Sequence, residues 1–233
     1  MNNYFSLING EFTNSISVLD RGLSYGDGIF ETMSWSFLKD KGQLGVEFWK
    51  RHLKRIEKSC LITKIKLPST KLLNNFKAKI LEKSFNSGIT QGILKIIITR
   101  GVGGRGYKYE SNMQPTIIFL SFPRVDLNYS LYSKGVRTRF CESPIFKNHQ
   151  LAGLKHLNRL DSVMGRSEWN NKNFFEGILV DDKENIIEGT MTNIFFARGK
   201  MLFTPLINHS GIKGVMRQII IEKSKKFFEK VEE

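Results

Sequence analysis

The sequence has little of what marks a secreted, membrane-bound or metal-binding protein. Its 233 residues include only two cysteines, Cys60 and Cys141, which are too few for a disulfide framework and favour a reducing compartment. No apolar run approaches the roughly 20 residues of a membrane-spanning helix, and the N-terminal MNNYFSLINGEF does not resemble a signal peptide. The four histidines lack the H-E-x-x-H spacing, so we expect no metal site. These absences predict a cytoplasmic protein without a membrane partner.

Acidic residues are also scarce, because 22 of them compare with 36 basic residues and the net charge is +14. Such a balance is typical of nucleic-acid-binding proteins, but a lysine-rich surface produces it as well. The lysines are scattered, and most aromatic residues are phenylalanines inside apolar runs rather than a platform for stacking bases. We therefore favour the lysine-rich surface and expect no nucleic-acid partner. A positive field is also compatible with a small anionic substrate.

Two short motifs suggest chemistry that their surroundings do not support. GVGGRG at residues 101–106 fits the G-x-G-x-x-G of dinucleotide-binding folds, but polar YKYESNMQPT follows where a helix is required. The glycines are more typical of a mobile loop that presents Arg105 and Tyr107. GLSYG at residues 22–26 fits the nucleophile elbow of serine hydrolases, but a strand, IFETMSW, is expected soon after it in place of a helix. Catalysis by Ser24 stays an alternative hypothesis.

Hydrophobic patterning predicts two groups of strands and helices. Strands are expected at residues 4–8, 92–100, 116–122, 136–141, 177–180, 193–197 and 201–203. Helices are expected from Trp49 to Cys60, from about Ser69 to Gly88, near residues 158–170, and from Gly214 into the charged C-terminal residues. Between the groups, SFPRVDLNYS has no clear period and predicts a linker. The sequence therefore predicts two α+β domains, residues 1–121 and 131–233, joined by residues 122–130.

Lys155 is a candidate catalytic residue, but composition alone does not decide between two interpretations of its side chain. It lies in AGLKHLNRLDSV, an otherwise apolar stretch just before an expected helix. In one interpretation its alkyl chain packs on apolar neighbours while its ammonium group reaches water. In the other, a partly desolvated pocket favours the neutral amine, which can form a Schiff base.

Six segments of the chain carry a resemblance to a known family. They are SVLDRGLSYGDGIFETM, RHLKRIEKSC, ILKIIITRGVGGRGY, GLKHLNRLDSV, IIEGTMTNIFF and GIKGVMRQ, and they span nearly the whole chain. In this order they resemble the fold-type IV pyridoxal-phosphate enzymes, which include branched-chain aminotransferases, D-amino-acid transaminases and aminodeoxychorismate lyases. The resemblance implies their two-domain α+β architecture and pyridoxal 5'-phosphate as cofactor. GGRGY, KHLNRLDSV and GVMRQ are most similar to the lyases, which convert 4-amino-4-deoxychorismate to 4-aminobenzoate and pyruvate for folate biosynthesis.

The resemblance implies a role for individual residues in cofactor binding. Lys155 matches the Schiff-base lysine, and Glu188 matches the carboxylate that keeps the pyridine nitrogen protonated. Arg55 matches the phosphate-binding arginine, whose guanidinium can meet two phosphate oxygens. Further cofactor contacts are expected from Thr192, Asn193, Gly214, Val215 and Met216. The last three begin a predicted helix, where free amides favour an anion.

The substrate is expected to contact Arg105, Tyr107 and Tyr25, because an arginine suits the two carboxylates of aminodeoxychorismate. A transaminase acting on D- or branched-chain amino acids is the alternative within the same fold, and a basic binding protein or an inactive truncated homologue is a second. The family pattern continues past the helix expected at Gly214 with a further strand and helix, so the C-terminal domain is expected to be shorter than usual. A homodimer is implied by the resemblance.

Overall fold

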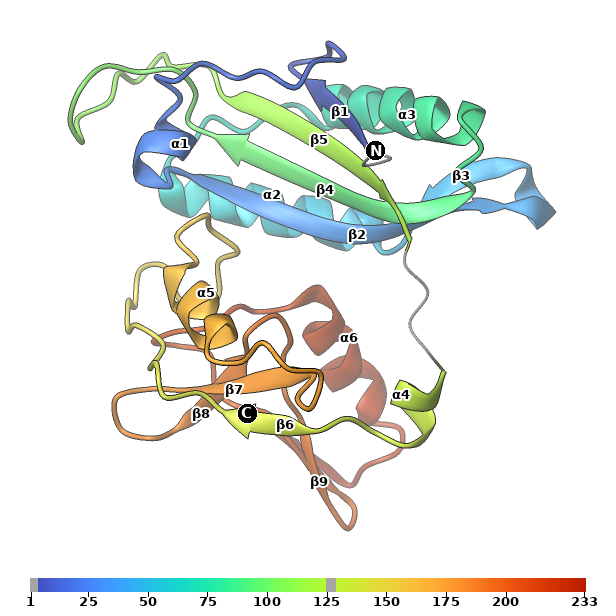
Figure 1. Cartoon of the computed structure of the whole chain (residues 1–233), viewed down its shortest axis with the longest axis vertical. Coiled ribbons are helices and arrows are strands. Elements are labelled where there is room, and N and C mark those ends of the chain that lie inside the picture. Colours follow the sequence, from blue (N-terminus) through green and yellow to red (C-terminus); the bar gives the residue numbers. More distant parts are fainter. Residues whose placement is uncertain (1–3, 125–128) are drawn as a thin grey trace. The chain divides into compact units, whose positions relative to one another are not determined.

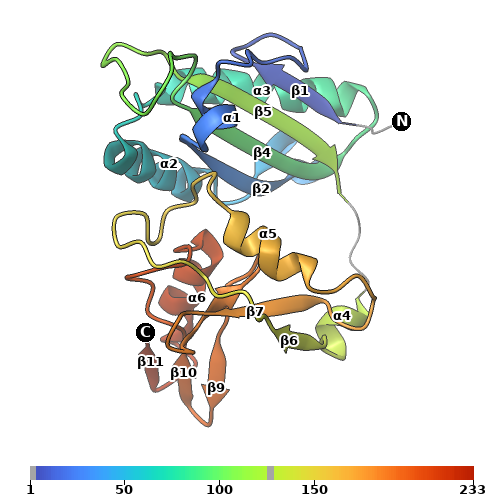
Figure 2. The same ribbon diagram turned by 60° about the vertical axis from the view of Figure 1, so that its left-hand side comes forward.

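The computed structural model describes residues 4–124 and 129–233, which form two compact units. The described residues up to Arg124 belong to the first unit, and so do Lys155–Asn158, although these lie far into the second part of the sequence. Most elements of the two units are labelled in Figure 1, and β10 and β11 are labelled in Figure 2. Each unit combines a sheet with helices, as the α+β pattern of the sequence predicts.

Unit 1 is built on a five-stranded antiparallel sheet in the order β1-β5-β4-β2-β3. Its strands are β1 (Phe5–Ile8), β2 (Gly28–Leu38), β3 (Gln43–Val46), β4 (Gln91–Thr99) and β5 (Thr116–Pro123). Two helices, α2 (Trp49–Thr63) and α3 (Thr70–Asn86), cover one face of this sheet (Figures 1 and 2). The short helix α1 (Arg21–Tyr25) precedes β2, and a 3-10 turn (Lys39–Lys41) joins β2 to β3.

The core of unit 1 lies between the sheet and these two helices. Side chains alternate across a strand, so Ile29, Met33 and Trp35 of β2 point to the covered face and are buried. From α2, Ile56 and Cys60 pack against them, as the spacing of apolar residues predicts. The predicted start of the second helix is also confirmed, because the Ser69 hydroxyl accepts a hydrogen bond from the Leu72 amide at 3.2 Å.

A segment from the second half of the sequence extends this sheet. Strand β3 pairs only with the end of β2, from Trp35 onwards, and leaves the first part of β2 at an edge. There the Phe30 amide donates to the Lys155 carbonyl at 2.8 Å, and the Leu157 amide donates to the Gly28 carbonyl at 2.9 Å. Lys155 was expected in the C-terminal domain. These edge hydrogen bonds instead place it in unit 1.

In its described residues, unit 2 contains two three-stranded sheets and three helices, several of which are labelled in Figures 1 and 2. The elements are α4 (Ser130–Ser133), β6 (Thr138–Phe140), α5 (Leu160–Ser167), β7 (Glu176–Val180), β8 (Ile186–Gly189), β9 (Phe196–Arg198), β10 (Met201–Phe203), α6 (Val215–Ser224) and β11 (Lys230–Glu232). The sheet orders are β6-β7-β8 and β11-β10-β9. Helix α5 packs on β7, and Cys141, Ile145, Trp169, Leu179 and Ile187 form the small core.

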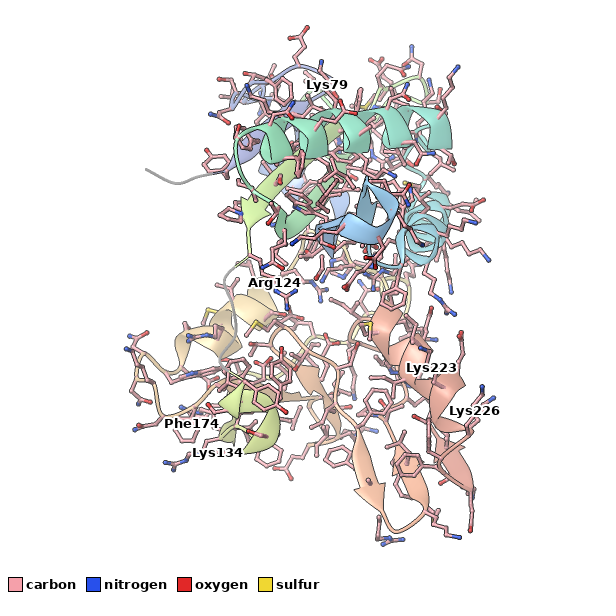
Figure 3. The ribbon with its side chains drawn as sticks, turned by 90° about the vertical axis from the view of Figure 1, so that its right-hand side faces the viewer. Lys79, Arg124, Lys134, Phe174, Lys223 and Lys226 are labelled. Atoms are coloured by element: carbon pink, nitrogen blue, oxygen red, sulfur yellow. The ribbon has the colours of Figure 1, made fainter. Side chains whose placement is uncertain are left out.

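The end of the chain differs from the expected helix. Helix α6 ends at Ser224, and Lys223 and Lys226 lie at its C-terminal end (Figure 3). The following residues turn back, and β11 pairs in parallel with β10. Since the sequence after Ser224 has many charged residues and few apolar ones at helical spacing, its strand is fixed by pairing with β10 rather than by its own pattern. Unit 2 therefore gains an edge strand that the sequence did not predict.

Other boundaries differ as well. The helix expected near residues 158–170 is confined to α5, and the strand expected at 136–141 to β6. The strand expected at 193–197 begins only at Phe196 and extends to Arg198. Within the predicted linker, β5 reaches Pro123 and α4 begins at Ser130, while residues 125–128 lie outside the described residues.

No helix of the described residues has the length and apolar character needed to cross a membrane.

The structure also decides between interpretations of the two glycine motifs. Ser24 lies inside α1, which begins after the cap residue Asp20 and ends at Gly26, and strand β2 follows. This is not the strand–turn–helix of a nucleophile elbow, in which the serine lies at the turn. After β4, the chain forms no helix before β5 begins at Thr116, which contradicts a dinucleotide-binding turn and leaves residues 101–115 as a loop.

Candidate functional site

Lys155 lies at the edge of the unit 1 sheet, held there by its main chain. Its carbonyl accepts the Phe30 amide, so the two residues are directly opposite and their side chains share one face of the sheet. The half-buried side chain extends over the ring of Phe30, with Nζ 4.3 Å from the ring centroid. The ring removes part of the water around the ammonium group and holds the amine in a defined place. Lys95 also lies over this ring, at 5.2 Å.

Arg55 extends from α2 to a buried carboxylate on β2. Its Nε donates to Glu31 Oε1 and its Nη2 to Glu31 Oε2, both at 2.6 Å. His52, one turn earlier on α2, places Nδ1 2.6 Å from the same Oε2. Burial by itself would raise the pKa of Glu31, but the hydrogen bonds from Arg55 and His52 outweigh it and hold that pKa below its usual range. Glu31 is therefore an anion that fixes the direction of the Arg55 guanidinium.

Two residues expected in the site, Lys155 and Arg55, are thus attached to neighbouring positions of one strand. Phe30 carries Lys155 on one face of β2, and Glu31 holds Arg55 on the face covered by α2. Strand alternation accounts for this division between faces.

The expected substrate residues gather where α1 approaches the loop after β4. The Tyr25 hydroxyl accepts a hydrogen bond from the Gly106 amide at 2.9 Å, and the rings of Tyr25 and Tyr107 lie edge to face at 5.5 Å. Tyr107 is 85% exposed, and Arg105 is exposed as well. The structure therefore brings Tyr25, Arg105 and Tyr107 into one exposed region of unit 1.

Glu188, in unit 2, is a buried carboxylate with donors around it. The Ile212 amide donates to its Oε2 at 2.8 Å, and the Asn193 Nδ2 donates to the same oxygen at 3.2 Å. Asn193 also donates to the Ile212 carbonyl at 2.9 Å, which joins the end of β8 to the segment before α6. Two of the residues expected to bind a cofactor, Glu188 and Asn193, are therefore in direct contact.

Thr192 belongs to a turn that a second buried carboxylate organises. Glu176 accepts hydrogen bonds from the Thr192 hydroxyl at 3.0 Å and from the Thr190 hydroxyl at 2.6 Å. It also accepts the main-chain amides of Thr190 and Met191, at 3.1 and 3.3 Å. The hydroxyl of Thr192 is thus directed to Glu176, and its expected contribution to cofactor binding stays a prediction.

The start of α6 has the features of an anion site. Gly214 is its cap residue and has no side chain that could cap the first amides, which include those of Val215 and Met216. A Cβ on Gly214 would overlap Oδ1 of Asn193, so a larger residue would force this helix start apart from its neighbour. The glycine therefore allows the amides and Asn193 to lie close together.

Glu31, His52 and Glu176 are functional candidates that the sequence interpretation did not single out. A signal was present for Glu31, because it occupies an inward position among Ile29, Met33 and Trp35, where a charged residue requires a partner. No comparable local signal marks Glu176, whose hydroxyl partners Thr190 and Thr192 lie 14 and 16 residues further along the chain.

Comparison with known proteins identifies the family. Residues 28–233 match the family described as amino-transferase class IV. An aminodeoxychorismate lyase of Vibrio harveyi is 34% identical over 218 residues, covering 92% of this chain and 75% of the relative. A putative branched-chain-amino-acid aminotransferase of Methanocaldococcus jannaschii is 30% identical and covers 94% of this chain and 74% of the relative. The crystal structure of 4-amino-4-deoxychorismate lyase from Pseudomonas aeruginosa has a TM-score of 0.86 at 31% identity, covering 97% of this chain and 80% of that one.

These matches confirm the expected two-domain α+β architecture and the resemblance on which it was based. They extend over both units, so the family assignment does not depend on a single motif. The chain belongs to the class IV aminotransferases, a family of enzymes that depend on pyridoxal phosphate.

Proposed function

We propose that this enzyme is an aminodeoxychorismate lyase, which eliminates pyruvate from 4-amino-4-deoxychorismate and leaves 4-aminobenzoate. The observation that carries the proposal is the similarity to two proteins of that name, one in sequence at 34% identity and one in structure at 31% identity. The exposed Arg105 beside Tyr107 adds a cation suited to a substrate with two carboxylates.

The residues present fit pyridoxal phosphate. Lys155 supplies the amine for a covalent link and is held by Phe30 on a sheet edge rather than on a free loop. Glu188 supplies a buried carboxylate for the pyridine nitrogen, fixed in direction by Ile212 and Asn193.

Two cationic or dipolar groups suit the phosphate. Arg55 would contribute its guanidinium, kept in place by Glu31. The amides at the start of α6, from Gly214 to Met216, would form the second anion-binding group, because the cap residue Gly214 has no side chain to accept their hydrogen bonds. Thr192 and Asn193 are proposed as further contacts to the cofactor.

The chemistry assigned to the chain is a proton transfer followed by elimination. Pyridoxal phosphate, when bound, supplies an electron sink for the carbon that carries the substrate amine. Lys155 would be the group that accepts the proton from this carbon, because its amine is held in a defined place over Phe30. Arg105, Tyr107 and Tyr25 would hold the carboxylates so that this carbon–hydrogen bond lies within reach of Lys155. Loss of pyruvate leaves an aromatic ring, so no second amino acceptor takes part.

The cofactor link is tested by absorbance and by mapping. Purified protein mixed with pyridoxal phosphate should turn yellow, and borohydride reduction should fix the cofactor on Lys155. Lys155→Ala should remove the yellow absorbance. Lys95→Ala is the matched control, because it removes an ammonium group from the same Phe30 ring and should leave the absorbance unchanged. A cofactor fixed to another lysine would contradict the assignment.

The reaction is tested with aminodeoxychorismate, by following the fluorescence of 4-aminobenzoate. Lys155→Ala should lower the rate by at least about 100-fold, the usual contribution of a general base. The alternative is an aminotransferase, which the 30% identity to the Methanocaldococcus relative supports. An aminotransferase would form a keto acid from D-amino or branched-chain amino acids and no aminobenzoate, and that result would overturn the lyase proposal.

We further propose that the enzyme is a homodimer that works in the cytoplasm and supplies folate biosynthesis. Val18, Leu19 and Leu23 near α1 expose 77%, 59% and 63% of their surface, which suits a covered interface better than water. Sedimentation velocity should give twice the monomer mass, and Leu23→Glu should shift it towards the monomer. A monomer at micromolar concentration would contradict the dimer. Cell fractionation tests the location, for which the two reduced, buried cysteines are the support.

A further inference from the structure

The loop between β4 and β5 carries two of the proposed substrate residues but has no helix or strand of its own. Glycines occupy positions 101, 103, 104 and 106, and most of its side chains are exposed. Such a segment normally samples many conformations, and a ligand that binds it must first order it. The proposed contacts of Arg105 and Tyr107 therefore depend on what holds the loop.

Arg21 of α1 is the main anchor. It is 3% exposed, and its Nη1 donates to the Gly106 carbonyl at 2.9 Å while Nη2 donates to the Tyr107 carbonyl at 3.2 Å. The Gly106 amide donates in turn to the Tyr25 hydroxyl. The peptide groups on both sides of Gly106 are thus fixed by side chains of one helix turn, 81 to 86 residues away in sequence.

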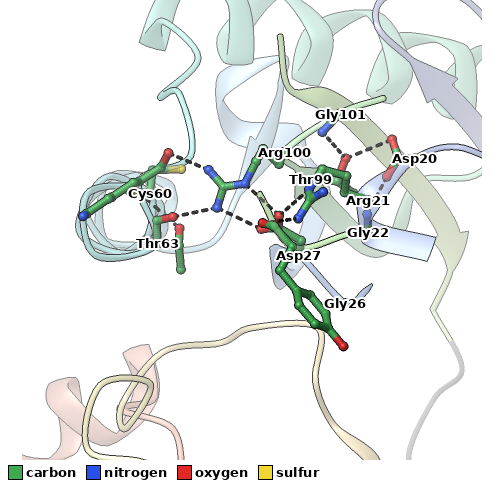
Figure 4. Close-up of polar contacts among 12 residues, drawn as sticks. Asp20, Arg21, Gly22, Gly26, Asp27, Cys60, Thr63, Thr99, Arg100 and Gly101 are labelled. Atoms are coloured by element: carbon green, nitrogen blue, oxygen red, sulfur yellow. Dashed lines mark hydrogen bonds and ion pairs between the residues drawn. The ribbon is translucent and has the colours of Figure 1, made fainter. Parts of the chain in front are cut away.

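Asp27 holds this anchor in place (Figure 4). Its Oδ2 accepts Nε of Arg21 at 2.9 Å and Nε of Arg100 at 2.7 Å, and its Oδ1 accepts Nη2 of Arg100 at 2.9 Å. Arg100 also donates to the carbonyls of Thr63 and Lys64 at the end of α2, at 2.8 and 2.7 Å. One carboxylate therefore links the loop, through two arginines, to the helix that carries Arg55.

The bond pattern explains why arginine is required at position 21. Nε binds the carboxylate while both terminal nitrogens bind carbonyls, so the planar group makes three directed hydrogen bonds. A lysine keeps the charge but offers one nitrogen, which cannot reach all three acceptors in that geometry. The role of Arg21 is therefore one of orientation more than of charge.

We propose that Arg21 and Asp27 are positioning residues, which hold the loop at residues 103–107 in the conformation that binds the substrate carboxylates. This inference rests on the proposed function for its substrate. The loop itself is a property of the chain and can be measured without any substrate. Because the loop would contribute to binding equally before and during the reaction, its loss should raise KM more than it lowers kcat.

The test compares Arg21→Lys with the wild type in two measurements. Hydrogen exchange of the Gly106 amide, which donates to the Tyr25 hydroxyl, should become at least tenfold faster in the variant. KM for aminodeoxychorismate should rise at least tenfold, with kcat changed less than threefold. Arg139→Lys is the matched control, because Arg139 also pairs with a carboxylate and donates to a carbonyl, but in unit 2. It should change neither quantity.

Asp27→Asn is the second variant, since it keeps the shape of the side chain, and it should change both quantities in the same direction. Should neither variant fold, the wild type alone decides. Its Gly106 amide should exchange at least tenfold more slowly than an unstructured amide, and free exchange there would overturn the proposal. Unchanged exchange and KM in a folded variant would overturn it too. Absence of lyase activity in the wild type would refute the proposed function but leave the exchange result valid for the loop.

Discussion

Replacing Glu31 with glutamine tests whether the buried pair with Arg55 determines both stability and acid sensitivity. The carboxylate is 2% exposed and makes three short contacts, two with Arg55 and one with His52. Breaking one partner of a buried ion pair costs about 3–5 kcal/mol. Glutamine keeps the shape and one acceptor oxygen, and 12% of the Arg55 side chain reaches water, so we expect a loss of about 2–4 kcal/mol at pH 7.

The same substitution has a defined pH dependence. The folded protein lowers the pKa of Glu31, so the carboxylate stabilises the fold above its unfolded pKa of about 4.3 and loses this effect as pH falls through the folded pKa. The difference between the wild type and Glu31→Gln should therefore be full at pH 7 and shrink below about pH 4. Glutamine does not titrate, so the variant should lack this part of the acid sensitivity.

Urea unfolding followed by circular dichroism measures both effects. With a slope of about 2–3 kcal/mol per molar, the expected loss corresponds to a midpoint shift of about 1 M. Glu57→Gln is the matched control, since Glu57 lies on the exposed face of α2 and its replacement should change stability by less than about 0.5 kcal/mol. A loss below about 1 kcal/mol for Glu31→Gln, or an equal loss at pH 7 and pH 3.5, would refute the reasoning.

Three further predictions follow from burial and backbone geometry. Burial raises the pKa of Cys60 to about 12 and that of Cys141 to about 11. At pH 8, a thiol reagent should therefore label both cysteines of the native protein more slowly than a free cysteine, and urea should remove this protection. Rapid labelling of the native protein would contradict this. Gly101→Ala should lower the free energy of unfolding by at least about 2 kcal/mol, because φ is +99° and the new Cβ would overlap a main-chain carbonyl oxygen; a urea midpoint equal to that of the wild type would show otherwise. Gly214→Ala, which would push Cβ into Asn193, should weaken pyridoxal phosphate binding at least tenfold in an absorbance titration, and unchanged affinity would remove Gly214 from the phosphate site.

Local periodicity was enough to predict most of unit 1. Trp49, Leu53, Ile56 and Cys60 predict α2 because a helix repeats every 3.6 residues, and the β-branched run ILKIIIT predicts β4. What failed was pairing between distant segments. The residues around Lys155 do not indicate that this segment pairs with the edge of β2, and those near residue 230 do not indicate a strand that pairs with β10. Hydrophobic periodicity describes one segment at a time and does not show which distant segment it pairs with.

The site residues also separate into those that the sequence predicts and those that only the structure shows. The cofactor and substrate candidates came from the family resemblance, whereas the residues that hold them in place were identified only in the structure. Arg21 and Gly106 are 85 positions apart, and Glu31 and Arg55 are 24 apart. Such pairs depend on the fold bringing two elements together, so a single sequence shows the charges but not which of them meet.

The charge of +14 can now be placed in the molecule. The buried charged residues of the described part include six carboxylates, Asp20, Glu31, Asp161, Glu176, Asp181 and Glu188, but no lysine. Burying a charge requires directed partners, and the scarce acidic residues have them in Arg55, Asn193 and main-chain amides. The excess of lysine is therefore a property of the surface, where each residue can change at little cost. Substituting several exposed lysines should alter the field that attracts an anionic substrate while leaving the fold intact, whereas replacing a buried carboxylate should lower the free energy of unfolding, as expected for Glu31→Gln.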